Sequence, residues 1–330
     1  MKDYIGITST VPVEIIFAAG LVPVDINNIF ILSDDPNRLV RIAKMDGFPD
    51  TTCSWICGLY GTVLEKGLKT IIGVVGGDCS ETIALMEILS LNDIEIIPFA
   101  YPHQRDKKIL FDELQRFSER FDVDMKRALK YKKKLDVIRA RIHYLDRLLW
   151  KEDRALGEEV HHFQLSSSDF NGDPDEFYNQ INHFIKEVEK RDPFRTEIRL
   201  GFLGVPPIIS DLYSRIEDNN VRIVYNEVQR QFSLPVPGSI VDSYYHYTYP
   251  YGIDARLSDI EREINHRKID GVIHYIQSFC FRGIEDIVLR KRLKIPVLTL
   301  QGDIPSRVTE IMEIRIEAFL DMLYRRKEKK

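Results

Sequence analysis

The stretch TIIGVVGGDCSETIALMEILSLNDIEIIPF, residues 70–99, decides the fold. Its first six residues, Thr70–Val75, are β-branched or apolar apart from one glycine, which is typical of a strand buried on both faces. The pattern then predicts a helix over Glu81–Ser90 and another strand over Ile94–Phe99. A strand, a helix and a second strand joined by short links predict parallel strands with a helical crossover.

The residues before this unit continue the same alternation. Tyr4–Ile7 is a short apolar run, and Pro12 opens a helical stretch, Val13–Ala19, that ends at a glycine. Proline in the first turn and glycine just past the last turn are the expected helix boundaries. A second strand is expected over Leu21–Ile26. We therefore predict an N-terminal α/β domain over residues 1–106.

Residues 107–194 differ in composition and predict a helical connecting region. Charged residues and leucine dominate residues 107–165, proline is absent there, and apolar residues recur at helical spacing. A further helix is expected from Asp175 to about Lys190. The basic run Lys130–Lys134 could be a nucleic-acid patch, but a charge run on a long helix is more often a solvated face.

The second half of the chain repeats the layout of the first half. A predicted strand leads into Cys79 in the first half and into Cys280 in the second. The next strand begins 15 residues after each cysteine, at Ile94 and at Ile295. We therefore predict two similar Rossmann/flavodoxin-like α/β domains with parallel sheets, the second over residues 195–330.

Composition narrows the class of protein. The 330 residues suit two domains, and 44% hydrophobic residues suffice for a core in each. The net charge of −5 argues against a nucleic-acid protein held by phosphate contacts. No apolar run is long enough for a membrane span, and the opening is typical of a strand and not of a signal peptide. Four cysteines are too few for a disulfide scaffold. We expect a cytoplasmic protein with reduced thiols.

Two cysteines occupy matched places that suit a ligand site. Cys79 and Cys280 each follow a predicted parallel strand and precede a helix, and α/β sheets bind ligands beyond the carboxyl ends of their strands. A helix N-terminus also lowers the pKa of a thiol and favours the metal-binding thiolate. The alternative is a pair of buried apolar thiols. Cys53 and Cys57 share one face of a helix, if they are helical, and no ferredoxin-type run exists.

Four segments together resemble a known family. The opening GITSTVPVEIIFAAGLVPV, residues 6–24, contains a Pro-x-Glu helix start and an Ala-x-Gly-x-x-Pro turn. Cys53 is followed by a glycine eight residues later, Cys79 follows an apolar strand, and Cys280 is followed by IPVLTLQGD and RIEAFL. These segments resemble the 2-hydroxyacyl-CoA dehydratase D-component family, which includes benzoyl-CoA reductase subunits. The resemblance covers the chain from end to end.

The resemblance implies a [4Fe–4S] cluster held by three thiolates, with one iron open to another ligand. Carried over by position, the ligands are Cys53, Cys79 and Cys280. Cys57 has no counterpart, and a helix-packing role fits it better than ligation. Glu14 is a candidate general acid or base near the substrate, although the helix dipole alone would stabilise a carboxylate at that position. The Tyr-rich stretch Asp242–Tyr251 either lines a pocket or packs against the neighbouring domain.

The resemblance also implies a function. It is that of an iron–sulfur catalytic subunit, a lyase of the 2-hydroxyacyl-CoA dehydratase type or a related ATP-dependent reductase component. An ATP-hydrolysing iron–sulfur activator feeds such subunits single low-potential electrons, which form a ketyl radical of an acyl-CoA thioester and allow loss of a hydroxyl group. Oxygen sensitivity, anaerobic function and a dimer of like or related subunits are expected. The alternatives are a non-catalytic electron-transfer or scaffold subunit, or a reductase of a small non-CoA substrate with a larger cluster.

Overall fold

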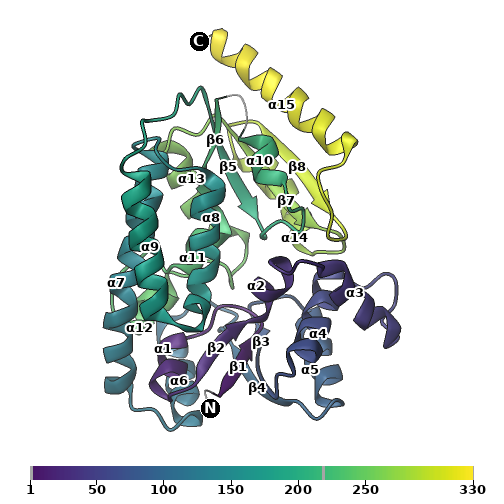
Figure 1. The fold of residues 1–330 in the computed structure, drawn as a ribbon, viewed down its shortest axis with the longest axis vertical. Coiled ribbons are helices and arrows are strands. Elements are labelled where there is room, and N and C mark those ends of the chain that lie inside the picture. Colours follow the sequence, from purple (N-terminus) through teal and green to yellow (C-terminus); the bar gives the residue numbers. More distant parts are fainter. Residues whose placement is uncertain (1–2, 218–219, 330) are drawn as a thin grey trace.

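The computed structural model describes residues 3–217 and 220–329. They form two four-stranded parallel sheets, with long helices running alongside both (Figure 1). The N-terminal end of the chain lies at the bottom of Figure 1, and helix α15 (Glu310–Glu328) projects at the top. None of the helices in these ranges combines the length and the apolar character that a membrane crossing needs.

The N-terminal sheet has the strand order β2-β1-β3-β4, and every neighbouring pair is parallel. Its strands are β1 (Tyr4–Ile7), β2 (Val22–Asp25), β3 (Thr70–Gly76) and β4 (Glu95–Ala100). All four were expected from the alternating pattern, with boundaries that differ by at most one residue. Parallel strands buried under helices on both faces explain why these runs are apolar instead of alternating.

The second sheet has the matching order β6-β5-β7-β8, again all parallel. Its strands are β5 (Ile198–Gly204), β6 (Val221–Asn226), β7 (Gly271–Gln277) and β8 (Val297–Gly302). The same order in both sheets confirms the prediction of two similar Rossmann/flavodoxin-like domains. Strand β8 begins two residues after Ile295, where the start was predicted.

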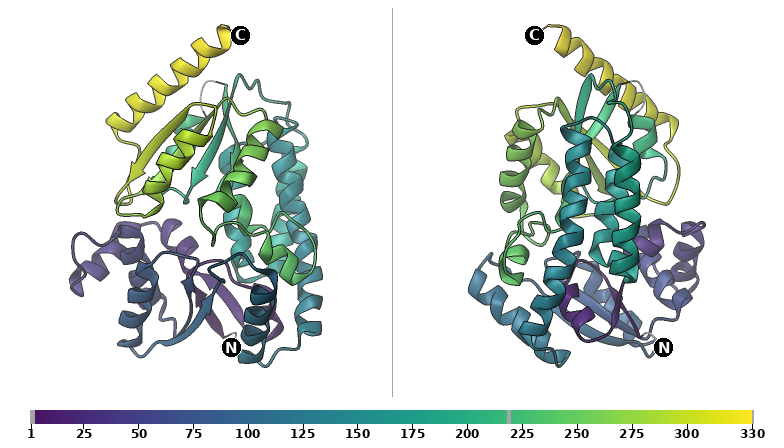
Figure 2. Two further views of the ribbon diagram at one scale, coloured as in Figure 1. Left: turned by 180° about the vertical axis from the view of Figure 1, so that it is seen from behind. Right: turned by 60° about the vertical axis from the view of Figure 1, so that its left-hand side comes forward.

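The long helix α7 (Met125–Trp150) connects the two halves of the fold, because it contacts α1 (Val13–Ala18) at one end and β6 at the other. It runs beside α9 (Pro174–Val188), as the right-hand view of Figure 2 shows. The Asp124 side chain caps its start by accepting a hydrogen bond from the Lys126 backbone. One apolar stripe of α7 faces the core, so this helix fixes how the two sheets sit relative to each other.

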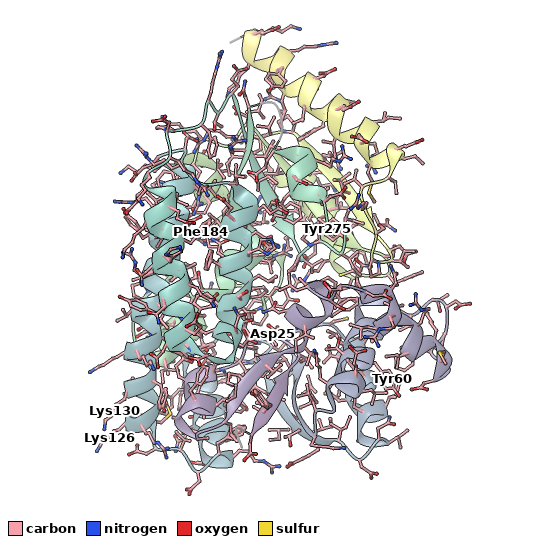
Figure 3. The ribbon with its side chains drawn as sticks, viewed as in Figure 1. Asp25, Tyr60, Lys126, Lys130, Phe184 and Tyr275 are labelled. Carbon is pink, nitrogen blue, oxygen red and sulfur yellow. The ribbon has the colours of Figure 1, made fainter. Side chains whose placement is uncertain are left out.

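The basic run on α7 is mostly a solvated face, as expected. Figure 3 shows Lys126 and Lys130 projecting away from the molecule. Lys132 is the exception, since its side chain is buried and pairs with Asp136 at 2.6 Å. Tyr131, within the same run, is partly buried and stacks on Phe17, so the run contributes two side chains to packing and exposes its other three lysines.

Short helices complete the layers around both sheets. In the first half these are α2 (Ile26–Ile31), α3 (Pro36–Met45), α4 (Ser54–Lys66) and α5 (Glu81–Ser90). The connecting region adds α6 (Lys107–Arg120), α8 (Gly157–Leu165), η1 (Ser166–Ser168) and η2 (Phe170–Gly172). The second half adds α10 (Leu212–Ile216), α11 (Glu227–Phe232), α12 (Ile240–Tyr245), α13 (Ile253–His266) and α14 (Arg282–Arg292).

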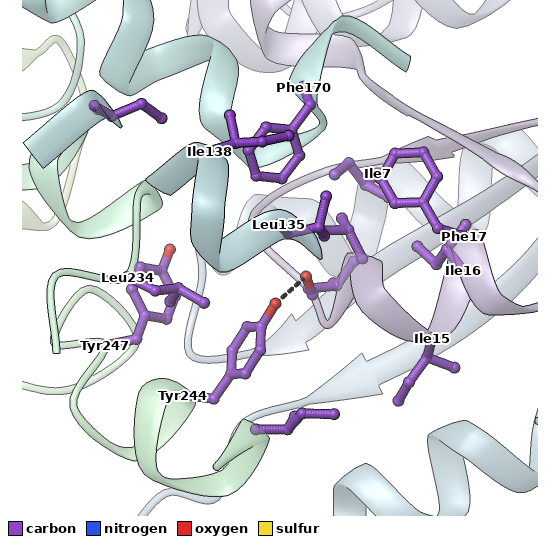
Figure 4. Close-up of a cluster of buried hydrophobic side chains, with 14 of the residues drawn as sticks. Ile7, Ile15, Ile16, Phe17, Leu135, Ile138, Phe170, Leu234, Tyr244 and Tyr247 are labelled. Atoms are coloured by element: carbon purple, nitrogen blue, oxygen red, sulfur yellow. Dashed lines mark hydrogen bonds between the residues drawn. The ribbon is translucent and has the colours of Figure 1, made fainter. Parts of the chain in front are cut away.

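A large apolar core joins the N-terminal sheet to the connecting helices. Figure 4 shows Leu135 and Ile138 of α7 among Ile7 of β1, Phe17 of α1 and Phe170 of η2. All five side chains are almost fully buried. Because this core spans segments more than a hundred residues apart, the loops at the strand ends are held on a rigid frame.

Candidate functional site

The site is a cavity of about 100 Å³ at the carboxyl ends of strands from both sheets. Its wall includes residues 8–10 after β1, residues 78–79 after β3, residues 205–206 after β5 and residues 279–282 after β7. In the order β2-β1-β3-β4, the connection that follows β1 runs toward one edge of the sheet and the connection that follows β3 runs toward the other edge. The carboxyl ends of β1 and β3 therefore flank a topological switch point, where α/β sheets bind ligands. Here the switch points of the two sheets contribute to a single cavity.

Three cysteines line this cavity, two from the first half of the chain and one from the second: Cys53, Cys79 and Cys280. Each lies at a helix start. Cys53 is the N-cap of α4, and Cys79 and Cys280 stand two residues before the first residues of α5 and α14. The structure thus brings together the three thiols that the sequence predicted as ligands.

The three sulfur atoms share one local geometry. Each accepts a hydrogen bond from the backbone N–H two residues further on, donated by Trp55 to Cys53, by Glu81 to Cys79 and by Arg282 to Cys280. Such N–H donors stabilise thiolates and tune iron–sulfur centres. The free helix N-termini supply them because the first N–H groups of a helix have no partner within it.

The pKa values of these thiols are raised and not lowered, which corrects the expectation from their helix positions. Burial raises the pKa of Cys53 to about 12 and that of Cys79 to about 11, and it also raises the pKa of Cys280. The N–H donors act in the opposite direction but are outweighed by desolvation. In the metal-free chain the three thiols are therefore protonated at neutral pH.

The thiols also feel one another's charge. A thiolate at Cys79 raises the pKa of Cys53, and one at Cys280 raises that of Cys79. Because the three negative charges would repel one another, three thiolates in this cavity would require a positively charged group, such as metal ions, between them. Among residues 3–217 and 220–329, no three His, Cys, Asp or Glu side chains are close enough to bind one metal ion. A four-iron cluster places its thiolates on different irons, so its ligands stand further apart, and the donor set fits such a cluster.

Comparison with protein-family sequence models identifies the family of this chain. The sequence model of the 2-hydroxyglutaryl-CoA dehydratase D-component matches residues 8–323, a range that includes both sheets and all three cavity cysteines. The chain belongs to this D-component family. A search of curated proteins found no match to the chain. Family membership supports a dehydratase-type component.

Cys57 of this D-component chain lies apart from the cavity. It sits one turn into α4, fully buried among apolar side chains, and is not part of the cavity wall. Its backbone N–H donates to the Cys53 carbonyl at 3.1 Å, as in a helix. The two cysteines share a helix, but only Cys53 stands at the end that reaches the cavity.

Glu14 also lies outside the cavity wall. Its carboxylate is fully buried, and it accepts hydrogen bonds from Arg139 Nη1 of α7 at 2.7 Å and from the Tyr244 hydroxyl of α12 at 2.8 Å. These contacts tie α1 to two later helices. Glu14 therefore has a structural role in helix packing, and its carboxylate does not contact the cavity.

Sequence reasoning missed a carboxyl group in the cavity, Asp25. It ends β2 and caps α2, with Oδ1 accepting from the Asn27 backbone at 2.9 Å, and Figure 3 shows it between the two sheets. Its own N–H donates to Asp169 Oδ2 at 2.7 Å. Burial raises the pKa of both carboxyls, that of Asp169 to about 7. The position of Asp25 near the carboxyl end of the predicted strand Leu21–Ile26 was the signal that could have revealed it.

The Tyr-rich stretch both lines the cavity and packs against the N-terminal domain. Tyr244 is fully buried against α1, whereas Tyr249 belongs to the cavity wall. The Tyr249 hydroxyl donates to Asp78 Oδ1 at 3.1 Å, and its carbonyl accepts from Arg282 Nη2 at 2.8 Å. This stretch therefore closes the cavity by linking the loop before Cys79 to the helix after Cys280.

Proposed function

We propose that this chain is the iron–sulfur catalytic subunit of a dehydratase- or reductase-type enzyme acting on an acyl-CoA-type substrate. The observation that carries the proposal is the convergence of Cys53, Cys79 and Cys280 on one cavity at the switch points of both sheets. These residues would hold a [4Fe–4S] cluster. When bound, the cluster would supply single electrons at low potential to the substrate.

The chain's own residues suit this role. The backbone N–H groups at the three helix starts stabilise the thiolates, and aromatic side chains such as Trp55, Phe232 and Phe281 give the cavity an apolar lining. Asp25 and Asp78 are carboxyl groups in the wall that can hold and release a proton, because burial raises the pKa of both, that of Asp78 to about 6. Glu14 has no part in the proposal, since its carboxylate is engaged elsewhere.

Two partners follow from the same proposal: a like or related subunit, and an ATP-dependent iron–sulfur activator. Apolar side chains next to the cavity wall support a covering partner. Phe279, which precedes Cys280 and belongs to the cavity wall, is 64% exposed, and Ile284, four residues after Cys280, is 72% exposed. Large apolar side chains left in water at such a place are typical of an interaction surface. A reducing cytoplasmic setting would keep the free thiols available.

Anaerobic purification with iron and sulfide analysis tests the proposal. A [4Fe–4S] protein should contain about four iron and about four sulfide per chain. Cys53→Ser should lose most of the iron, because only three thiolate ligands are available. Cys57→Ser, the same change on the same helix, should keep it. Iron loss confined to Cys57→Ser, or the absence of iron and sulfide in the wild type, would contradict the ligand assignment.

A redox titration followed by electron paramagnetic resonance separates the catalytic subunit from an electron carrier. The catalytic role requires a cluster that is reduced only at low potential or by an ATP-driven activator, and that is bleached by oxygen. A cluster that is reduced at mild potential and survives air would instead favour the electron-transfer or scaffold role.

A further inference from the structure

A groove of about 750 Å³ lies on the other side of the cavity wall, beside the edge strand β2. Residues of β2, α2, α3, α4 and η2 line this groove. Asn28 lines both the groove and the cavity, so the wall is one residue thick at that point. Asp25 lines the cavity, and Asp169 lines the groove. The two hollows are therefore separated by a wall that carries a carboxyl group on each side.

The two carboxyl-bearing residues are in contact within this wall. Asp169 Oδ2 accepts a hydrogen bond from the Asp25 backbone N–H at 2.7 Å, and the Asp25 carboxyl is hydrogen-bonded to the Ser168 hydroxyl. Both aspartates are 5% exposed. Burial raises the pKa of both carboxyls, and the negative charge of Asp25 adds to the rise at Asp169, to about 7. The ionisation of one carboxyl therefore depends on whether the other holds a proton.

The charged groups around this carboxyl pair do not supply a counter-ion. Asp78, in the loop after β3, acts on Asp25 from the cavity side. In the described part of the chain, no basic side chain pairs with either carboxyl. A proton is therefore what neutralises the buried pair. The other charged lining residues are Glu81 and Arg282 in the cavity and Asp34, Asp35, Arg38, Glu65 and Lys66 in the groove.

Asn28 offers an unused acceptor at the point where the two hollows meet. Its Nδ2 donates to the Leu165 carbonyl at 3.3 Å and to Ser168 Oγ at 3.2 Å, and the carbonyl fixes the orientation of the amide because it can only accept. Asn28 Oδ1 is buried and accepts no hydrogen bond from the described residues. Buried acceptors are rarely left unpaired, so a donor such as water or a protonated carboxyl is expected there. The amide therefore provides a hydrogen-bonding position between the groove and the cavity.

The proposed function uses protons inside the cavity. A hydroxyl group leaves as water only when it gains a proton. The cavity volume of about 100 Å³ is below the roughly 300–1,000 Å³ of typical ligand pockets, so a bound ligand leaves little space for water that could deliver the proton. Asp25 and Asp78 can each give one proton, and Asp25 is backed by a second carboxyl that reaches the groove. Exposed lining residues such as Lys66 open the groove to solvent.

We propose that Asp169 and Asp25 carry protons through this wall, from the groove to a ligand bound in the cavity. Asp25 gives its proton to the departing hydroxyl group, Asp169 restores the proton of Asp25, and water in the groove restores that of Asp169. Each transfer moves one proton and no electron. An O–H bond of groove water breaks, an O–H bond of the departing water forms, and the buffer neutralises the hydroxide that remains. The inference rests on the proposed function for the reaction that uses the proton, and it adds the source of that proton.

Infrared spectroscopy of the protonated carboxyl band tests the coupling without a substrate. The anaerobic, cluster-loaded full chain is titrated from about pH 4 to about pH 9, a range that includes the ordinary pKa of a carboxyl and the raised pKa of Asp169. In Asp25→Asn, the titration of Asp169 should move to lower pH, because the like charge that raises its pKa is gone. Asp34→Asn makes the same change at an exposed position of the groove and should leave the titration of Asp169 unchanged.

A pH jump followed by infrared absorption tests whether Asp169 supplies Asp25. The chain is first saturated with butyryl-CoA, an acyl thioester that has no hydroxyl group to lose, and the rate at which Asp25 gains its proton is then measured. Asp169→Asn should slow this step roughly tenfold or more, whereas Asp169→Glu, which keeps a carboxyl group, should not. Imidazole should restore the rate in Asp169→Asn, because it is small enough for the groove and donates protons near neutral pH. A purely structural role of Asp169 would not respond to imidazole.

The outcomes separate the inference from the proposed function. An Asp169 titration that ignores Asp25→Asn, or an unchanged protonation rate in Asp169→Asn, would overturn the proton route and leave the acyl-CoA function in place. Failure of butyryl-CoA to bind the cluster-loaded chain would overturn the proposed function, and the inference with it. If Asp169→Asn does not fold, the comparison of the wild type with Asp25→Asn still decides.

Discussion

Replacement of Glu14 by glutamine distinguishes a catalytic carboxylate from a structural one. Glutamine keeps the size and one acceptor oxygen of glutamate but removes the charge. Arg139, which is 3% exposed, would then lose the fully buried partner that stands 2.7 Å from its Nη1. The structure predicts a loss of stability with no direct effect on the cavity.

The contacts around Arg139 set the size of the effect. Loss of one partner from a buried ion pair typically destabilises a protein by about 3–5 kcal/mol, because the remaining charge is left uncompensated. Asp136 Oδ1 stands 3.0 Å from the same Nη1 and is partly exposed, so some compensation remains. We therefore expect a loss at the lower end of the range, about 3 kcal/mol.

A double-mutant cycle measured by urea unfolding and circular dichroism tests the reasoning. Glu14→Met with Arg139→Met replaces the pair by apolar side chains of similar length, which usually restores much of the stability. The Tyr244 hydroxyl keeps an acceptor in the double variant, the Val11 carbonyl at 2.9 Å. The double variant should thus be more stable than either single variant.

The opposite result would refute the structural role. If Glu14→Gln unfolds at the wild-type urea concentration, the pair does not stabilise the fold. If it also binds iron and substrate normally but loses turnover, Glu14 acts in catalysis despite its burial. Iron content per folded chain is the matching control, and it should not change.

Three further predictions follow from other parts of the fold. The pKa of Asp169 is about 7 in the folded chain and ordinarily about 4, so between these pH values the folded chain holds a proton that the unfolded chain has released. Stability of the metal-free chain should therefore fall as the pH rises through this window, by up to about 1.4 kcal/mol per pH unit, and Asp169→Asn should flatten the slope in urea titrations. Gly61→Ala would place a Cβ 2.1 Å from the Leu39 carbonyl oxygen, so it should displace α4, lower stability by several kcal/mol and reduce iron content, whereas exposed Lys66→Ala on the same helix should do neither. Sedimentation of the anaerobic protein at micromolar concentration should show a dimer, and a monomer alone would count against the proposed subunit partner.

Local sequence patterns determined most of the fold. Strands β3 and β7 were predicted because β-branched apolar runs of this length suit buried parallel strands, and helix α5 was predicted residue for residue. The repeat of these patterns predicted the matching order of the two sheets, since the crossover rule leaves few alternatives. Cys79 and Cys280 were found for the same reason, because a site at the carboxyl end of a strand is a consequence of local order.

The tertiary structure decided the properties that depend on surroundings. Sequence placed Cys79 at a helix start and so favoured a lowered pKa, but the folded chain buries the thiol, and desolvation outweighs the helix terminus. The contact between Asp25 and Asp169, 144 residues apart, has no local signal. The burial of Glu14 against Arg139 likewise depends on how α7 crosses α1. Periodicity reports which face of an element is apolar, whereas burial of a charge depends on which other elements pack there, and that is set only when the whole chain has folded.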